Sequence, residues 1–328
     1  MKGSLTGTET NAWSARIRSR RPLFYSDASP GRPDHVRAAS GLTWFSVNGR
    51  ERLLLAQDDA SFLALVDPFG ERPNVECLPL DHVVRGLRIF EKSLGNKQYK
   101  LDLEACATLP IGGVEYGIAF GSGSLPIRET LVVVSAEGST RIVDASAFYA
   151  QLIENKAFSG SELNLEGATR IGDLIWLLQR GNGAAKGKLT PVDAMASIRV
   201  ESLVEFLDGK APPMLENVTS YALGAIEGVR LTFTDATSTP SGELVMLLGA
   251  EASPDAIEDG VVAGAAIGRC MPGEDVVWSL LRNADGTPSR AKVEGIEPHR
   301  PGTEGRYWVV VDCDDPTCPA ELLDVELI

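Results

Sequence analysis

The chain has 328 residues, of which 44% are hydrophobic, and its 45 acidic and 31 basic residues give a formal net charge of −14. This length and apolar content allow a sizeable core, while the negative charge argues against a nucleic-acid partner or an anionic membrane surface and favours a cation as ligand. The longest apolar runs are far shorter than the roughly 20 residues of a membrane span, and no charged-then-apolar signal segment opens the chain. Five cysteines without paired spacing fit reduced thiols, so we expect a cytoplasmic protein.

The N-terminal region divides into two parts. Residues 1–11 are polar, and we expect them to be disordered. Residues 13–18 alternate between apolar and charged side chains, which is typical of a half-exposed strand. The four arginines at positions 16, 18, 20 and 21 either protect a sheet edge from further pairing by their charge or form an anion-binding arm.

The rest of the sequence predicts five units of short strands. Four units have four strands each, and the last has three. The expected strands lie at residues 40–44, 52–56, 62–66 and 75–80; at 101–108, 114–120, 129–134 and 140–143; at 163–169, 174–178, 194–200 and 202–206; at 229–234, 243–248, 262–269 and 276–281; and at 292–298, 307–311 and 322–327. A short helix is expected within 145–156 because of its apolar spacing. The sequence pattern of residues 216–228 does not indicate a particular secondary structure.

One sequence pattern recurs in these units. An alternating stretch leads to an acidic residue followed by Gly or Ala, as in Leu-Asn-Leu-Glu-Gly at residues 163–167 and Leu-Asp-Leu-Glu-Ala at 101–105, and an apolar strand follows. With Ser40, Glu104, Glu166, Asp235 and Glu294 taken as equivalent, the repeat is roughly 60 to 70 residues long, which is typical of radial repetition. We therefore predict an all-β fold, a single β-propeller domain over residues 12–328. Five blades are expected, the last closed by the N-terminal strand; six remain an alternative.

This topology predicts a functional face. In a four-stranded blade the start of the innermost strand and the end of the second strand lie on the same side of the disc, so polar residues at these positions should gather around the central channel. A cluster of carboxylates would repel unless it is protonated or binds a cation, and many oxygen donors suit Ca²⁺. The predicted calcium ligands are Glu104, Glu166, Asp235, Glu294, Gln57, Asp58, Gln179, Glu251 and Asp312. The alternative is that these carboxylates are structural and bridge neighbouring blades.

Known families share parts of this pattern. The Glu-Gly pair at 166–167 resembles the metal-binding Glu-Gly-Pro of gluconolactonase-type propellers, and similar pairs occur in esterase-like, phytase-related propellers. Those resemblances imply a propeller with a metal in its channel, although the Pro is absent here, which argues against a sugar-lactone substrate. Residues 96–105, 121–124 and 179–183 resemble an uncharacterised bacterial propeller family, a domain of unknown function, over roughly residues 35–328.

Two functions follow for the predicted face. In the first, the protein is a metal-dependent hydrolase of an ester or phosphoester: Glu104 or Glu166 activates water, and an anionic small molecule binds to Lys97, Lys100, Arg128, Arg180 and Asn182. In the second, the face binds a ligand or a protein without turnover, and the basic residues serve only as ion-pair partners. The three histidines lie in separate loops without a nucleophile motif, so a catalytic triad has little support. The oligomeric state stays open.

Overall fold

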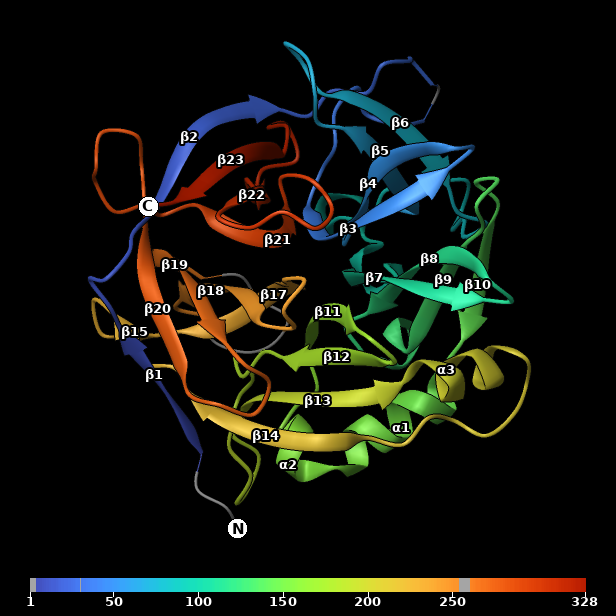
Figure 1. The fold of residues 1–328 in the computed structure, drawn as a ribbon. Coiled ribbons are helices and arrows are strands. Elements are labelled where there is room, and N and C mark those ends of the chain that lie inside the picture. Colours follow the sequence, from blue (N-terminus) through green and yellow to red (C-terminus); the bar gives the residue numbers. More distant parts are fainter. Residues whose placement is uncertain (1–3, 30, 254–259) are drawn as a thin grey trace.

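The structure is a computed structural model that describes residues 4–29, 31–253 and 260–328, and its strands form antiparallel groups around a common centre (Figure 1). The first group contains β3 (Ala39–Val47), β4 (Arg50–Gln57), β5 (Phe62–Asp67) and β6 (Asn74–Pro79). The second contains β7 (Leu103–Ile111), β8 (Val114–Gly121), β9 (Thr130–Val134) and β10 (Thr140–Asp144). The third contains β11 (Leu165–Ile171), β12 (Leu174–Gln179), β13 (Asp193–Arg199) and β14 (Glu216–Ala222).

The remaining strands complete the circle. The fourth group contains β17 (Thr232–Ser238), β18 (Leu244–Glu251), β19 (Val262–Cys270) and β20 (Val276–Arg282). The fifth contains β21 (Lys292–Pro298), β22 (Arg306–Asp312) and β23 (Glu321–Leu327), and β2 (Ala15–Pro22) pairs antiparallel with β23. The first strand of each group faces the centre, and these inner strands contact one another in the closed order β3, β7, β11, β17, β21 and back to β3.

Apolar side chains fill the spaces between adjacent groups. One buried cluster lies between each neighbouring pair of groups, so there is no single central core. The second strands therefore pack on both faces, and Leu53, Leu54, Leu55 and Ala56 of β4 are all fully buried. This two-sided burial explains why the second strands read as continuous apolar runs. It also leaves the centre of the ring to polar residues.

The N-terminal segment is more ordered than expected. Leu5–Glu9 form strand β1, which pairs parallel with both β14 and β20, so the prediction of disorder is wrong for these residues. Residues 1–3 of that segment lie outside the described residues. Strand β1 joins the edges of the third and fourth groups, and a short parallel contact of β2 with β20 extends the same mixed sheet to the fifth.

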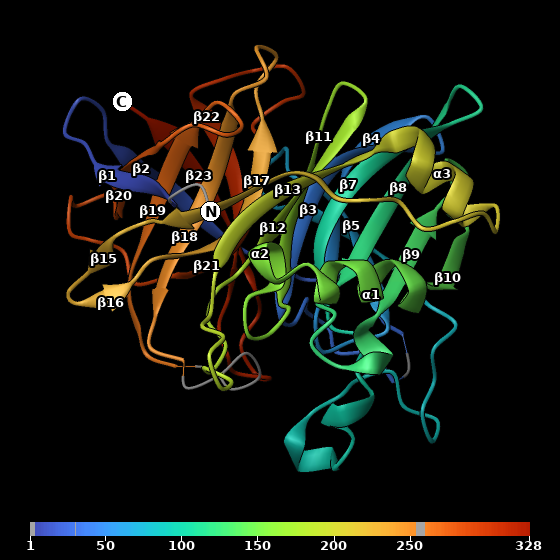
Figure 2. The same ribbon diagram turned by 90° about the horizontal axis from the view of Figure 1, so that it is seen from below.

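Short helices pack around the outside of the third group and the segments leading to it (Figure 2). The expected helix within 145–156 is confirmed as α1 (Ser146–Glu154), followed by α2 (Lys156–Ser159). The strand expected at 202–206 is wrong, because α3 (Val200–Leu207) occupies it and buries Val200, Leu203 and Leu207 at helical spacing. Smaller elements are η1 (Lys92–Leu94), η2 (Lys97–Tyr99), η3 (Pro126–Arg128), β15 (Ala225–Ile226) and β16 (Val229–Arg230). Among the described residues, no helix is long and apolar enough to cross a membrane.

Candidate functional site

A polar pocket lies at the centre of the ring, at the end where the inner strands begin. It has a volume of about 50 Å³, enough for a few water molecules or one hydrated ion. All of its lining side chains are polar or charged, with seven carboxyl groups and four basic groups. The lining residues are Ser40, Asp58, Lys100, Asp102, Glu104, Arg128, Asn164, Glu166, Arg180, Asn182, Glu251, Ser253, Lys292, Glu294 and Asp312. We call this the central pocket.

A β-bulge near the start of three inner strands places one glutamate on the pocket wall. The strand register shifts at Glu104 in β7, at Glu166 in β11 and at Glu294 in β21, because each of these residues is the extra one opposite the second strand. The residue after each acid is small, since the next inner strand lies against it. A Cβ on Gly295 would come within 2.4 Å of the backbone oxygen of Ser40. The repeated Glu-Gly or Glu-Ala pair thus combines a pocket side chain with a close strand contact.

Asp235 does not line the pocket. The bulge of β17 falls between Phe233 and Asp235, so Thr234 is the residue equivalent to the three glutamates, and the sequence alignment was wrong by one position. Asp235 instead takes the position of the small residue. Its side chain is fully buried, and its Oδ2 accepts a hydrogen bond from the backbone N–H of Ile296 at 2.9 Å. This acid is a structural bridge to the neighbouring strand, as the alternative hypothesis proposed.

The two glutamines predicted as ligands are also absent from the pocket. The side chain of Gln57 bonds to the hydroxyl of Tyr25 and to the carbonyl of Phe62. Gln179 donates to the carbonyls of Glu162 and Arg180. Both amides satisfy backbone groups where the chain leaves the second strand, and among the described residues neither lines the central pocket.

Five pocket residues were missed: Ser40, Asp102, Asn164, Ser253 and Lys292. Of these, Asp102, Asn164 and Lys292 each lie two residues before one of the inner-strand glutamates, in Asp-Leu-Glu, Asn-Leu-Glu and Lys-Val-Glu. Alternate residues of an extended segment share a face, so this spacing was the signal that could have found these three. The other predicted residues that do line the pocket are Asp58, Glu104, Glu166, Glu251, Glu294, Asp312, Lys100, Arg128, Arg180 and Asn182.

A buried ion-pair network occupies one side of the pocket. The ammonium group of Lys100 lies 2.6 Å from Asp58 and 2.5 Å from Asp102. The second oxygen of Asp102 accepts from Arg128 at 2.6 Å and from the hydroxyl of Ser122 at 2.5 Å. Although burial opposes the charge of Asp102, Lys100 and Arg128 hold its pKa below the usual range. This carboxylate is therefore ionised and fully engaged.

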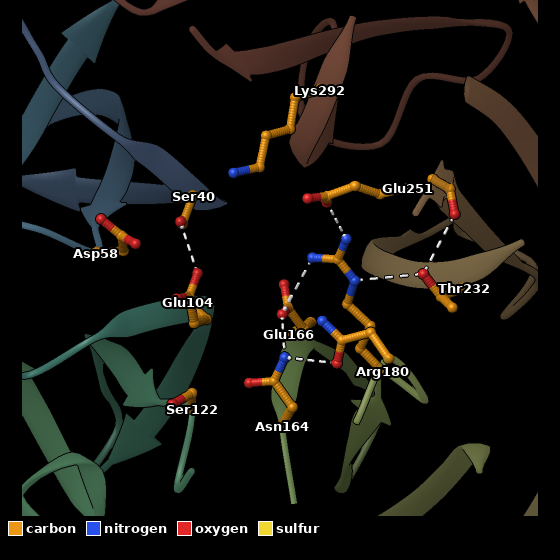
Figure 3. Close-up of polar contacts among 12 residues, drawn as sticks. Ser40, Asp58, Glu104, Ser122, Asn164, Glu166, Arg180, Thr232, Glu251 and Lys292 are labelled. Atoms are coloured by element: carbon orange, nitrogen blue, oxygen red, sulfur yellow. Dashed lines mark hydrogen bonds and ion pairs between the residues drawn. The ribbon is translucent and has the colours of Figure 1, made fainter. Parts of the chain in front are cut away.

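Arg180 organises the opposite side (Figure 3). Its guanidinium binds Glu251 at 2.5 Å and Glu166 at 3.3 Å, and its Nε donates to the hydroxyl of Thr232 at 3.3 Å. Asn164 donates to the same oxygen of Glu166, Oε1, at 2.6 Å. Both described partners of Glu166 thus use Oε1, and Oε2 has no described partner.

Three carboxyl groups on three inner strands, those of Glu104, Glu166 and Glu294, have oxygens without a described hydrogen-bond partner. Glu104 accepts one hydrogen bond, from Ser40 to Oε2 at 2.8 Å, and Glu294 has no hydrogen bond or ion pair among the described residues although it is only 5% exposed. Burial raises the pKa of Glu104 and Glu294 well above the usual range and that of Glu166 to about 7. For Glu104 the nearby carboxyl groups add to the increase. One oxygen each from Asp58, Asp102 and Glu104 also lies within 4.8 Å of the others.

Lys97 lies outside the central pocket. It lines a neighbouring pocket of about 160 Å³, formed by the segments after β4 and β22 and by the loop at residues 90–100. We call this the outer pocket. Of the five ligand-binding residues predicted from sequence, the other four lie in the central pocket.

The ring of sheets and the acidic centre define a β-propeller with a charged central pocket. The chain belongs to a family described as a family of unknown function, DUF6929, whose model matches residues 35–327, and this confirms the family resemblance inferred from sequence. A comparison with curated proteins finds no match.

Solved structures show distant likeness. The PQQ-bound aldose sugar dehydrogenase from Streptomyces coelicolor has 10% identity and a TM-score of 0.44, with 98% of this chain and 100% of that chain covered. A thermostable family-43 glycoside hydrolase has 12% identity and a TM-score of 0.41, with 88% and 90% covered. A putative glycoside hydrolase from Parabacteroides distasonis has 12% identity and a TM-score of 0.43, with 92% of both chains covered.

Proposed function

We propose that the central pocket binds one divalent cation, Ca²⁺, through Glu104, Glu166 and Glu294. The observation that carries this proposal is the set of carboxylate oxygens without described partners, which come from three different inner strands and include both oxygens of Glu294. Carboxylates buried side by side are costly unless a proton or a cation compensates them. Oxygen-only donors of this kind fit Ca²⁺, which takes about six to eight oxygen ligands.

Calcium titration of metal-stripped protein tests the site directly. Isothermal calorimetry should show one calcium ion bound to the wild type, and Mg²⁺ should bind more weakly because it requires near-octahedral geometry. Glu294→Gln should weaken calcium binding roughly tenfold or more, since a charged ligand is lost. Glu115→Gln is the matched control, because Glu115 forms an exposed ion pair with Arg170 at the strand ends that lie away from the central pocket. If the wild type shows neither heat nor a thermal shift, the carboxyl groups are structural.

Hydrolysis of an ester or phosphoester is the activity that this site would support. Bound Ca²⁺ would polarise an oxygen of such a substrate. Glu166 lines the same pocket and its Oε2 has no described partner, so as an ionised carboxylate beside the cation it would accept a proton from the attacking water. Generic ester and phosphoester substrates, tested with calcium and with chelator, should be hydrolysed by the wild type and not by Glu166→Gln.

A non-catalytic role is the second candidate, and one observation favours it. Lys100 and Arg180 each join two carboxylates, so part of the acidic cluster is neutralised within the protein. If calcium binds but no ester or phosphoester is hydrolysed, the pocket is a cation-stabilised platform for a ligand. The two candidates therefore differ in turnover and not in calcium binding.

We also propose that residues 12–328 form one five-bladed domain in which β2 closes the last blade. The antiparallel pairing of β2 with β23 and the closed order of the inner strands support this count. A sixth blade would have to lie at residues 145–160 or 210–228. The first segment contains helices α1 and α2, and the second contains β14 of the third group and the short β15. A cytoplasmic location remains the prediction from composition.

A further inference from the structure

The outer pocket lies directly beside the central pocket and shares four lining residues with it: Asp58, Lys100, Lys292 and Asp312. These four residues form ion pairs, Lys100 with Asp58 at 2.6 Å and Lys292 with Asp312 at 3.6 Å. These ion-paired residues therefore line both pockets and make the two pockets adjacent. A group bound in the outer pocket would lie next to a cation in the central pocket.

Lys97 is the distinctive charge of the outer pocket. Its side chain has no hydrogen bond or ion pair within the described ranges, whereas the side chain of Arg37, on the same pocket, is held by Asp59 at 2.6 Å and by Glu91 at 2.9 Å. An ammonium group on a pocket wall without a carboxylate partner is available to a ligand.

The backbone that carries Lys97 is fixed. The buried side chain of Asn96 accepts from the backbone N–H of Glu91 at 2.9 Å and donates to the carbonyl of Ile89 at 2.8 Å. The ring of His82 bonds to the carbonyl of Tyr99 at 2.8 Å. Both ends of the short η2 turn are thus held by hydrogen bonds within the loop at residues 82–99, which limits the positions open to the Lys97 side chain.

We propose that the outer pocket binds a small oxyanion, of the kind found in phosphate monoesters and carboxylates, through Lys97 and next to the cation of the central pocket. This inference rests on the proposed calcium site. Six acidic residues line the outer pocket against five basic ones, so an oxyanion meets a net negative charge when the central pocket holds no cation; the acidic residues are Asp58, Asp59, Glu91, Asp312, Asp314 and Asp315. Two added positive charges reverse that balance. Anion and calcium binding are then coupled, and each must increase the affinity for the other by the same factor.

Calorimetry with two soluble probes tests the coupling and separates the two sources of oxyanion. Methyl phosphate and acetate are titrated separately into calcium-loaded and metal-stripped protein. At least one probe should bind to the calcium-loaded wild type, roughly tenfold or more tightly than to the stripped protein, and the tighter probe identifies the class. Lys97→Gln should weaken that binding roughly tenfold, since a charge-assisted hydrogen bond is lost. Lys210→Gln, which removes an exposed ammonium paired with Glu205 on the periphery, should not change it.

The outcomes distinguish this inference from the calcium proposal. Calcium binding without probe binding overturns the oxyanion site and leaves the proposed function intact. Probe binding that is equal in Lys97→Gln and wild type overturns the role of Lys97, and probe binding that is equal with and without calcium overturns the coupling. If calcium itself does not bind, the proposed function and this inference both fail.

Discussion

At the scale of single residues, Lys100 competes with a metal ion for carboxylate oxygens. Its ammonium group contacts both Asp58 and Asp102, two of the three residues whose oxygens lie within 4.8 Å of one another. Calcium can use these oxygens only if the ammonium group moves. If the proposed cation binds, Lys100 would therefore lower its affinity at this side of the central pocket.

Lys100→Gln should tighten calcium binding, by roughly tenfold, because two carboxylates lose their internal cation. The same substitution should lower the stability of the metal-free protein by about 3 kcal/mol, since a buried ion pair is broken and Asp102 keeps only Arg128 as a charged partner. Calorimetry and thermal melts check both effects. Unchanged or weaker calcium binding would show that the ion does not approach Asp58 and Asp102.

Glu166 should make the stability of the metal-free protein depend on pH. Its pKa is about 7 in the folded protein against 4.5 for the free group, so between these values the native state binds a proton that the unfolded chain has released. Stability therefore falls as the pH rises through this window, and the metal-free melting temperature should be a few degrees lower at pH 7.5 than at pH 5.5. Asp312, with a pKa of about 7, acts in the same direction.

Calcium should reverse this trend, because it binds the ionised carboxylates and displaces their protons. Its stabilising effect should grow from pH 5.5 to pH 7.5, and Glu166→Gln should flatten both profiles. Thermal melts at the two pH values, with calcium and with chelator, measure this. A calcium effect that is equal at both pH values would place the ion away from the titrating groups.

The sequence predicted most of the pocket residues but not their full set. The repeated Glu-Gly and Glu-Ala pairs identified Glu104, Glu166 and Glu294. The bulge position carries the glutamate, and the close strand contact requires a small residue directly after it, so both features are visible in the sequence. Asp235 was misassigned because a shift of one position in a strand moves a side chain to the opposite face, and the residue at the bulge there is a threonine without charge. Only the pairing register, which depends on distant residues, resolves this.

At the scale of secondary-structure elements, the close packing of inner strands depends on small residues after the bulge. Gly295→Ala should destabilise the protein by about 1 to 3 kcal/mol, because the new Cβ would lie 2.4 Å from the backbone oxygen of Ser40 and 2.8 Å from a methyl group of Val310. Gly249→Ala is the control, since its nearest neighbour is the end of a threonine side chain at 3.2 Å. Equal melting temperatures for the two variants would contradict the tight contact between β21 and β3.

The wrong prediction of a strand at residues 202–206, like the misassignment of Asp235, arose because the local sequence fits two structures. The segment begins directly after β13, and its apolar residues fit a buried strand as well as a helix over so short a length. The helical spacing of Val200, Leu203 and Leu207 extends past the predicted limits on both sides. Strand β14 has many partly exposed side chains, so residues 216–222 lacked the apolar pattern of a buried strand.

At the scale of the whole molecule, both N-terminal strands tie separate groups together. Removing residues 1–22 should lower the melting temperature on the order of 10 °C, because β23 loses its outer partner and the side chains packed around Ala15 and Ile17 become exposed. Removing only residues 1–11, with the mostly exposed β1, should cost much less. An unchanged melting temperature for the longer truncation would rule out closure by β2.

The pairing of β2 with β23 also sets the order in which the chain can fold during synthesis. Strand β2 is synthesised long before Val325 and Leu327, the residues that pair with Ile17 and Ala15. Until then the outer edge formed by residues 15–22 has no antiparallel partner and can pair with other chains. Contacts between residues that lie far apart in the sequence also form slowly during folding. The β2–β23 pair can therefore form only after β23 has been synthesised, and a nascent chain stalled before β23 would carry an open sheet edge.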